Sequence, residues 1–218
     1  MSQGISITNS SGFVLIDQEY SNYRLIQSGT ASMESLVSFP AQSNGVAVFV
    51  GHTPSSRQVS LLSISSSSFV LRGTTSEMNS QNFQPFSISY RVYALISANV
   101  PPSSYGLVVN NSAGARVFTS EAKYPLVNQV AFYNSPSTSA VTISVPSASP
   151  FVSIGETLAF SSAFSPSEAN IGPVFQPAYD IKSGSVVVRS SQTDTQYPGG
   201  TGTYVYWASN RNLISLRA

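Results

Sequence analysis

Short stretches that alternate apolar and polar residues run through the whole chain and constrain its fold most strongly. The clearest carry β-branched or aromatic residues between glycine, serine, proline or asparagine: "GVAVFVG", "FSISYRVYALIS", "QVAFYN", "AVTISV", "GSVVVRS" and "GTYVYWA". Residues 30–39 permit one short helix, but no segment keeps the helical i, i+3, i+4, i+7 spacing over three turns. We therefore predict an all-β chain with antiparallel sheets.

Two segments near the start and the middle of the chain resemble each other at a distance of 102 positions. The segment "GISITNSSGFVLIDQEY" begins at Gly4 and "GLVVNNSAGARVFTSEA" begins at Gly106. In both, apolar residues at alternate positions flank an Asx-type turn. The turn ends at Gly12 in the first copy and at Gly114 in the second, where glycine can adopt a positive φ without steric cost. Both segments are predicted to be β-hairpins.

Two further pairs of similar segments indicate that a whole module is duplicated. "FVLRG" at 69–73 resembles "VVVRS" at 186–190, and "RVYAL" at 91–95 resembles "YVYWA" at 204–208. The proline-containing segment "NVPPSS" at 99–104 is the best boundary, because it cannot continue a central strand. We predict two tandem antiparallel β-sandwich-like modules, 1–98 and 105–218, joined by a linker at 99–104. One continuous β structure built from both halves is the alternative.

The chain is poor in charge and has no cysteine. Charged residues make up 9% of the 218 residues and the formal net charge is +1, so no electrostatic footprint for nucleic acid or an anionic membrane is present. Polarity comes from serine, threonine, asparagine and glutamine, which suit packed interfaces. No apolar run approaches the ~18 residues of a membrane span, and the opening lacks a secretory signal pattern. We expect a soluble product made in the cytoplasm, which assembles with copies of itself.

No constellation of catalytic or metal-binding residues stands out. His52 is the only histidine, so it alone could serve a Ser-His-Asp arrangement, and we expect it to be a loop residue. Asp17 and Glu19 could share a strand face, but the second copy keeps only the glutamate, as Glu121, and has Thr119 in place of the aspartate. We predict no enzymatic activity, no cofactor and no structural metal.

Aromatic residues are the more informative candidates for a binding surface. Alternation places Tyr204 and Tyr206 on one face of a strand and Trp207 on the other, so both faces of this strand are expected to be covered. A sandwich core with a lid of loops explains this pattern. An interface or a sugar-stacking platform is the alternative, and these three residues are the predicted contact residues.

The second hairpin segment resembles a motif of small tail proteins of tailed bacteriophages. Members of that family carry the pattern YGLxVxNxxGxxVFxS, and "YGLVVNNSAGARVFTS" at 105–120 follows it. The first copy departs from the pattern, because Gln3 stands where Tyr105 stands, and Asp17 and Gln18 replace Thr119 and Ser120.

The resemblance implies a virion component of the tail tip or baseplate region with no assigned enzymatic activity, so it transfers no catalytic residues. We therefore expect a structural protein that contacts other tail proteins and forms a homo-oligomer around the tail axis. A host surface receptor is a further candidate partner. The alternative is a receptor- or carbohydrate-binding β module of a tail fibre.

Overall fold

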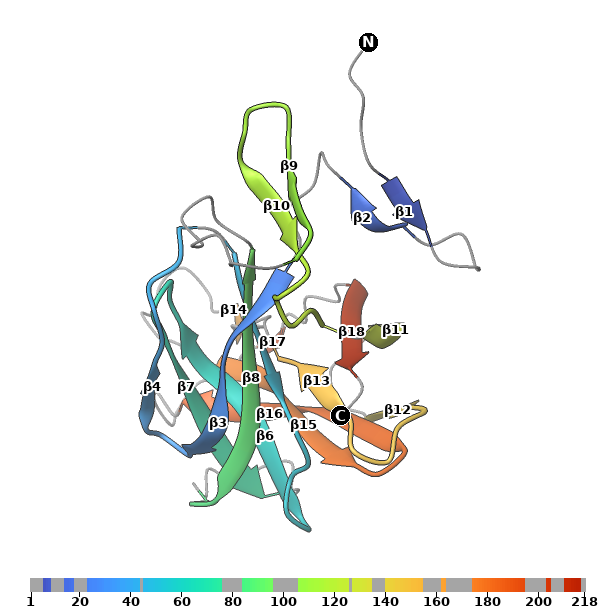
Figure 1. Cartoon of the computed structure of the whole chain (residues 1–218). Helices are drawn as coiled ribbons and strands as arrows, with labels where there is room; N and C mark the ends of the chain where they lie inside the picture. Colours follow the sequence, from blue (N-terminus) through green and yellow to red (C-terminus); the bar gives the residue numbers. More distant parts are fainter. Residues whose placement is uncertain are drawn as a thin grey trace.

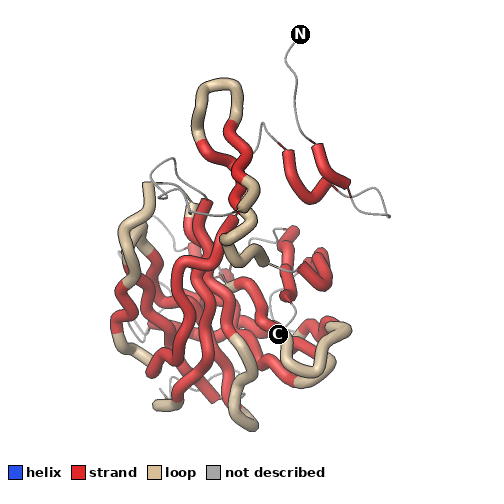
Figure 2. The backbone as a smooth tube through the Cα atoms, in the orientation of Figure 1, coloured by secondary structure: helices blue, strands red, loops and turns tan. Residues whose placement is uncertain are grey.

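The computed structural model describes residues 6–8, 14–17, 23–43, 45–75, 84–95, 106–125, 127–134, 140–154, 162–163, 174–194, 203–204 and 210–216. These residues form strands, turns and loops, and the tube in Figure 2 shows the strands in red with no helix among the described segments. Accordingly, the described part of the chain contains no helix that is long and apolar enough to cross a membrane.

Two six-stranded antiparallel sheets make up the body of the molecule (Figure 1). We call them sheet I and sheet II. In spatial order, sheet I consists of β11 (Val127–Asn134), β18 (Asn210–Leu216), β13 (Phe151–Ser153), β5 (Val46–Val50), β8 (Ser87–Leu95) and β3 (Tyr23–Ser32). Sheet II consists of β12 (Val141–Ser144), β16 (Ser185–Asp194), β15 (Val174–Lys182), β6 (Arg57–Ile64), β7 (Ser68–Thr75) and β4 (Leu36–Ser38).

Three small two-stranded sheets accompany the sandwich. They are β1 (Ser6–Thr8) with β2 (Val14–Asp17), β9 (Val108–Asn110) with β10 (Arg116–Thr119), and β14 (Ser162–Ala163) with β17 (Thr203–Tyr204). Figure 1 shows the β9–β10 hairpin projecting beyond one end of the sandwich, with the β1–β2 hairpin near the same end.

The predicted all-β, sandwich-like class is confirmed, and the sandwich is continuous through both halves of the chain. β5 from the first half pairs with β13 from the second, with Val50 opposite Val152. β6 pairs with β15 in the same way, with Val59 opposite Tyr179. Of the two arrangements that the sequence left open, the structure therefore has the continuous one. The predicted linker at 99–104 lies outside the described residues.

The two small hairpins are paired in the same register. Ile7 lies opposite Ile16 in β1–β2, and Val109 lies opposite Phe118 in β9–β10, so both partners are displaced by 102 positions. The register shift in each hairpin falls at the next pair along the strands. The sequence similarity between the two segments therefore corresponds to equal strand pairing, down to the position of the bulge.

The strands of the sandwich repeat in the same manner. Leu25 of β3 lies opposite Tyr93 of β8, and Val127 of β11 lies opposite Leu216 of β18, with a register shift directly after each pair. From one end, sheet I runs β3, β8, β5, and from the other end it runs β11, β18, β13. Sheet II likewise runs β4, β7, β6 from one end and β12, β16, β15 from the other. In both sheets the first-half and second-half strands therefore follow in the same order. The strand order and register thus describe two copies of one six-stranded unit, related by an approximate two-fold axis.

The sequence similarity between 91–95 and 204–208 does not follow this repeat. The strand equivalent to β8 is β18, because β18 pairs with β11 as β8 pairs with β3. The similarity of 91–95 to 204–208 therefore does not mark equivalent strands. By contrast, Leu71 of β7 lies opposite Leu61 and Val188 of β16 lies opposite Tyr179, which places 69–73 and 186–190 in corresponding strands.

Apolar side chains fill the space between the sheets and also cover part of the outer face of sheet I. Val48 and Val50 of β5 point into the main core, whereas Phe49 between them points outward, as alternation along a strand requires. Phe49 is 4% exposed and packs with Tyr93 and Leu216 in an outer cluster. Sheet I is therefore apolar on both faces near its centre.

Candidate interaction surface

The β9–β10 hairpin is shaped by its turn. The Asn111 carboxamide oxygen accepts hydrogen bonds from the backbone N–H groups of Ala113 (3.1 Å) and Ala115 (2.8 Å). Gly114 has a φ of 77°, in the left-handed region, and its N–H donates to the Asn111 carbonyl at 2.9 Å. Gly114 thus lies in the turn of this hairpin. Gly12, its counterpart in the first copy, lies outside the described residues.

Tyr124 fastens the base of this hairpin. Its ring stacks on Phe118 with 5.0 Å between centroids and 7° between planes. Its hydroxyl donates to the Thr119 carbonyl at 2.7 Å and accepts from the Thr119 N–H at 2.8 Å. The preceding residue, Lys123, accepts a backbone hydrogen bond from Leu25 of β3 at 2.7 Å. The hairpin is therefore attached to the edge of sheet I rather than hanging from a free loop.

The pKa of Tyr124 is raised from its ordinary value, chiefly because partial burial disfavours the phenolate. The hydrogen bond to the Thr119 backbone and the nearby charge of Arg24 oppose this shift. Because the folded pKa lies above the unfolded one, the associated stability is present below the unfolded pKa of 10.0 and is lost as the pH rises through the folded pKa. Ionisation also removes the proton that the hydroxyl donates to Thr119.

We expect Tyr124→Phe to lower the free energy of unfolding by about 1 kcal/mol at neutral pH, because both hydrogen bonds to Thr119 are lost while the ring stack remains. Urea unfolding at neutral and alkaline pH measures this difference, which should shrink as the pH rises above 10.0, because the hydroxyl then ionises in the unfolded chain before it does so in the folded one. Tyr93→Phe is the control, because burial also raises the pKa of Tyr93, but this residue lies in β8 and not at the base of the hairpin. A Tyr124→Phe difference that grows with pH would contradict this account.

Large apolar side chains that remain exposed cluster at the margins of the sheets. Among the described residues, these are Tyr23, Leu36, Leu107, Val127 and Val130, with exposed fractions from 38% to 65%. All except Leu107 lie on a strand at the end of a sheet: Tyr23 on β3, Leu36 on β4, and Val127 and Val130 on β11. Edge strands offer unpaired backbone groups, so exposed apolar residues there favour contact with another chain.

The edges at the two ends of the sandwich differ in charge. β11 and β12, which end the two sheets on the second-half side, contain no charged residue and no proline. At the other end, β3 contains Arg24, and the Glu34 carboxylate beside β4 forms an ion pair with Arg72 at 3.0 Å. Charged side chains and proline are the usual protection of an edge strand. The second-half end lacks this protection, and we take it as the candidate interaction surface.

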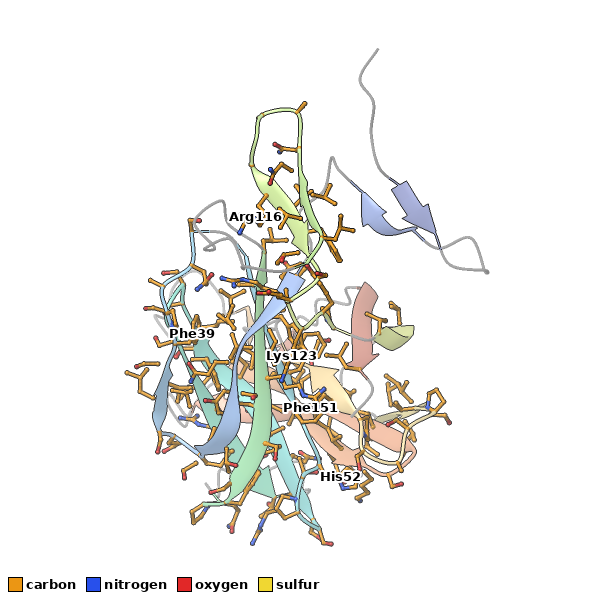
Figure 3. All side chains as sticks on the ribbon, viewed as in Figure 1. Phe39, His52, Arg116, Lys123 and Phe151 are labelled. Carbon is orange, nitrogen blue, oxygen red and sulfur yellow. The ribbon has the colours of Figure 1, made fainter. Side chains whose placement is uncertain are left out.

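The outer face of sheet I brings further aromatic residues together near the centre of the sheet, on β13, β5 and β8. The Arg91 guanidinium lies 3.9 Å from the centroid of the Phe151 ring, which Figure 3 labels. Phe49 and Tyr93 meet edge to face with 5.5 Å between centroids. Burial raises the pKa of Tyr93, while the charge of Arg91 and a hydrogen bond from it act in the opposite direction. Tyr93 therefore stays protonated and packed at neutral pH.

Of the three aromatic residues predicted to form a contact surface, the structure describes only Tyr204. Tyr204 lies in β17, opposite Ser162 of β14. Tyr206 and Trp207 lie outside the described residues. The described structure therefore does not bring the three together into a surface, and their contact role stays a prediction.

His52 lies in the loop after β5 and is exposed, as expected for a loop residue. Its neighbour Thr53 is buried and joins the two halves: its hydroxyl accepts from the Ile181 N–H at 2.9 Å and donates to Asp180 at 3.1 Å. The Lys182 ammonium lies 2.8 Å from the other oxygen of Asp180. These interactions occupy both oxygens of the buried carboxylate, so they account for Asp180 as a structural link.

The other carboxylates considered from the sequence do not form a pair in the described structure. Asp17 ends β2, Glu121 is exposed after β10, and Glu19 lies outside the described residues. No group of three or more histidine, cysteine, aspartate or glutamate side chains suited to a metal ion occurs among the residues described. The prediction that the protein is not an enzyme stays a prediction.

Comparisons with known proteins identify no relative of this chain. No family model, no curated protein and no solved structure matches it. The function of the chain has therefore to be inferred from its own residues and their geometry.

Sequence reasoning missed the exposed valines of β11 and the role of Tyr124. The pattern "QVAFYN" predicts a strand, but the position of this strand at a sheet edge depends on strand order. Its lack of charge was the available signal, since protected edges usually carry lysine or proline. For Tyr124, a tyrosine shortly after a hairpin is a weak indication of a ring that folds back onto it.

Proposed function

We propose that this protein is a structural subunit of a bacteriophage virion, in the tail tip or baseplate region, which acts through contacts with copies of itself and with other tail proteins. The observation that carries the proposal is the uncharged second-half end of the sandwich, where Val127 and Val130 are 55% and 47% exposed on an edge strand. In an isolated protein such an edge promotes aggregation, whereas in an assembly it can form a contact with a neighbouring subunit.

Two further features support this proposal. A chain with 9% charged residues has few groups that oppose association, and its net charge of +1 provides little repulsion between copies. The segment 105–120 resembles the motif of small phage tail proteins, and its described part, 106–120, contains the β9–β10 hairpin, which Tyr124 fastens at its base. A firmly held projecting hairpin can contact a neighbouring subunit without a large ordering cost.

Localisation in particles tests the proposal. We expect a fusion tag or antibody against the protein to label the tail tip of intact particles, and particles made without the protein to have an incomplete tip. Complete particles that adsorb poorly to host cells would instead favour the receptor- or carbohydrate-binding alternative, which a glycan array with the purified protein would then examine. A label absent from the tail, together with a complete tip in particles lacking the protein, would overturn the proposal.

A further inference from the structure

Both sheets end in an uncharged strand at the same end of the sandwich. β11 ends sheet I and β12 ends sheet II, and both lie on the right in Figure 1, opposite β3 and β4. β11 is eight residues long and its sequence "VNQVAFYN" has no charge. Among the described residues, its only backbone hydrogen bonds to another strand are those to β18. The described structure thus leaves the outer side of a long, uncharged strand open to pairing.

The opposite end of the sandwich is less suited to strand pairing. The Leu25 N–H on β3 is already bound to the Lys123 carbonyl at 2.7 Å. The Gln27 side chain of β3 donates to the Ser38 carbonyl of β4 at 3.0 Å, so the two edge strands are bridged. Arg24 adds a charge to the β3 edge. A head-to-tail chain of copies, in which β11 meets β3, therefore has to displace existing contacts.

The molecule itself shows how two such edges can join. Its halves meet where β5 pairs antiparallel with β13 in sheet I and β6 pairs antiparallel with β15 in sheet II. In each case equivalent strands of the two halves meet around the approximate two-fold axis, and both sheets continue through the junction. Pairing of equivalent edges is therefore a mode of association that this sequence already uses within one chain.

We propose that two copies of this chain associate through their second-half ends, with β11 of one copy pairing antiparallel with β11 of the other. This inference rests on the proposed function, because it names a partner for the same surface. A two-fold arrangement centred on Val130 places this residue of each copy opposite the same residue of its partner and keeps Val127 of each copy within the paired strand. With no charged residue on either strand, the pairing brings no like charges together. β12 lies beside this contact and extends it to sheet II.

Sedimentation equilibrium of the full-length protein tests the pairing. We expect the wild type to form a dimer and Val130→Lys to weaken dimerisation by more than about tenfold, because two lysines would face each other across the junction. Leu36→Lys is the matched control. It places the same charge on an exposed residue of β4, at the other end of the sandwich, and should leave the dimer unchanged. Circular dichroism verifies that each variant keeps its strand content.

A cysteine cross-link provides an independent measurement, because the natural chain has no cysteine. We expect Val130→Cys to form a covalent dimer under mild oxidation, and Leu36→Cys to remain monomeric under the same conditions. A monomeric wild type at high concentration, or equal effects at Val130 and Leu36, would overturn the pairing. If the protein nevertheless labels the tail tip, the proposed function survives without this partner; a dimer that is absent from particles would refute the function alone.

Discussion

Replacing Phe69 with alanine should lower the free energy of unfolding by about 3–5 kcal/mol. Phe69 is fully buried in the main core between the sheets. Its ring lies 6.4 Å from that of Phe39 and 5.2 Å from that of Tyr90, edge to face in the second case. Truncation removes the buried ring and both of its aromatic contacts. It also leaves a cavity, which the neighbouring strands can close only in part. Urea unfolding followed by far-ultraviolet circular dichroism measures the difference.

Leu36→Ala is the matched control for this substitution. Leu36 is on β4, which pairs directly with β7, but its side chain is 65% exposed, so its truncation should change stability by less than about 0.5 kcal/mol. Equal losses for Phe69→Ala and Leu36→Ala would mean that the core between the sheets does not centre on Phe69. If Phe69→Ala does not fold, Phe69→Leu still ranks the two sites, because it leaves a smaller cavity.

Features that depend on neighbouring residues could be predicted from the sequence. The all-β class follows from alternation within single strands, and "NNSAG" specified a turn, because the Asn111 side chain caps its own loop and Gly114 supplies the positive φ. The repeat at 102 positions was visible for the same reason. Its hairpins are local units, so the same residues recur at the same places in the same register.

Strand partners could not be predicted, because they depend on contacts between distant residues. "VAVFV" in β5 reads equally well as the edge of a separate module or as an inner strand. It is an inner strand because β13, about 100 positions further along, pairs with it. The similarity of 91–95 to 204–208 misled for a related reason. Valine and tyrosine are common in many strands, and only the register around the bulge identifies β18 as the equivalent of β8.

The same distinction, between features set by nearby residues and features set by distant ones, applies to the candidate interaction surface. Sequence reasoning directed attention to Tyr204, Tyr206 and Trp207, because aromatic residues often mark contact surfaces. The exposed valines of β11 are ordinary strand residues until the strand order places them at an edge. Low charge is a property of the whole chain, so the sequence alone did not indicate which part of the molecule an association would involve.

Thr53→Val should lower the free energy of unfolding by about 2–4 kcal/mol, although it changes the side-chain volume very little. The Thr53 hydroxyl accepts from the Ile181 N–H at 2.9 Å and donates to Asp180 at 3.1 Å, and both partners are buried in the second half of the chain. Valine leaves the Ile181 N–H and one Asp180 oxygen without this partner, in a place that water does not reach. The Lys182 ammonium still neutralises Asp180, which limits the loss.

Thermal and urea unfolding of the full-length protein measure this effect, with Thr30→Val as the control. Thr30 is an exposed strand residue, so the same chemical change there should stay within about 0.5 kcal/mol of the wild type. Because Thr53 links the halves across a continuous sandwich, we expect the Thr53→Val variant to unfold in a single transition at lower urea. Two separate transitions would indicate that the halves unfold independently, and an unchanged midpoint would show that the hydroxyl does not stabilise the junction.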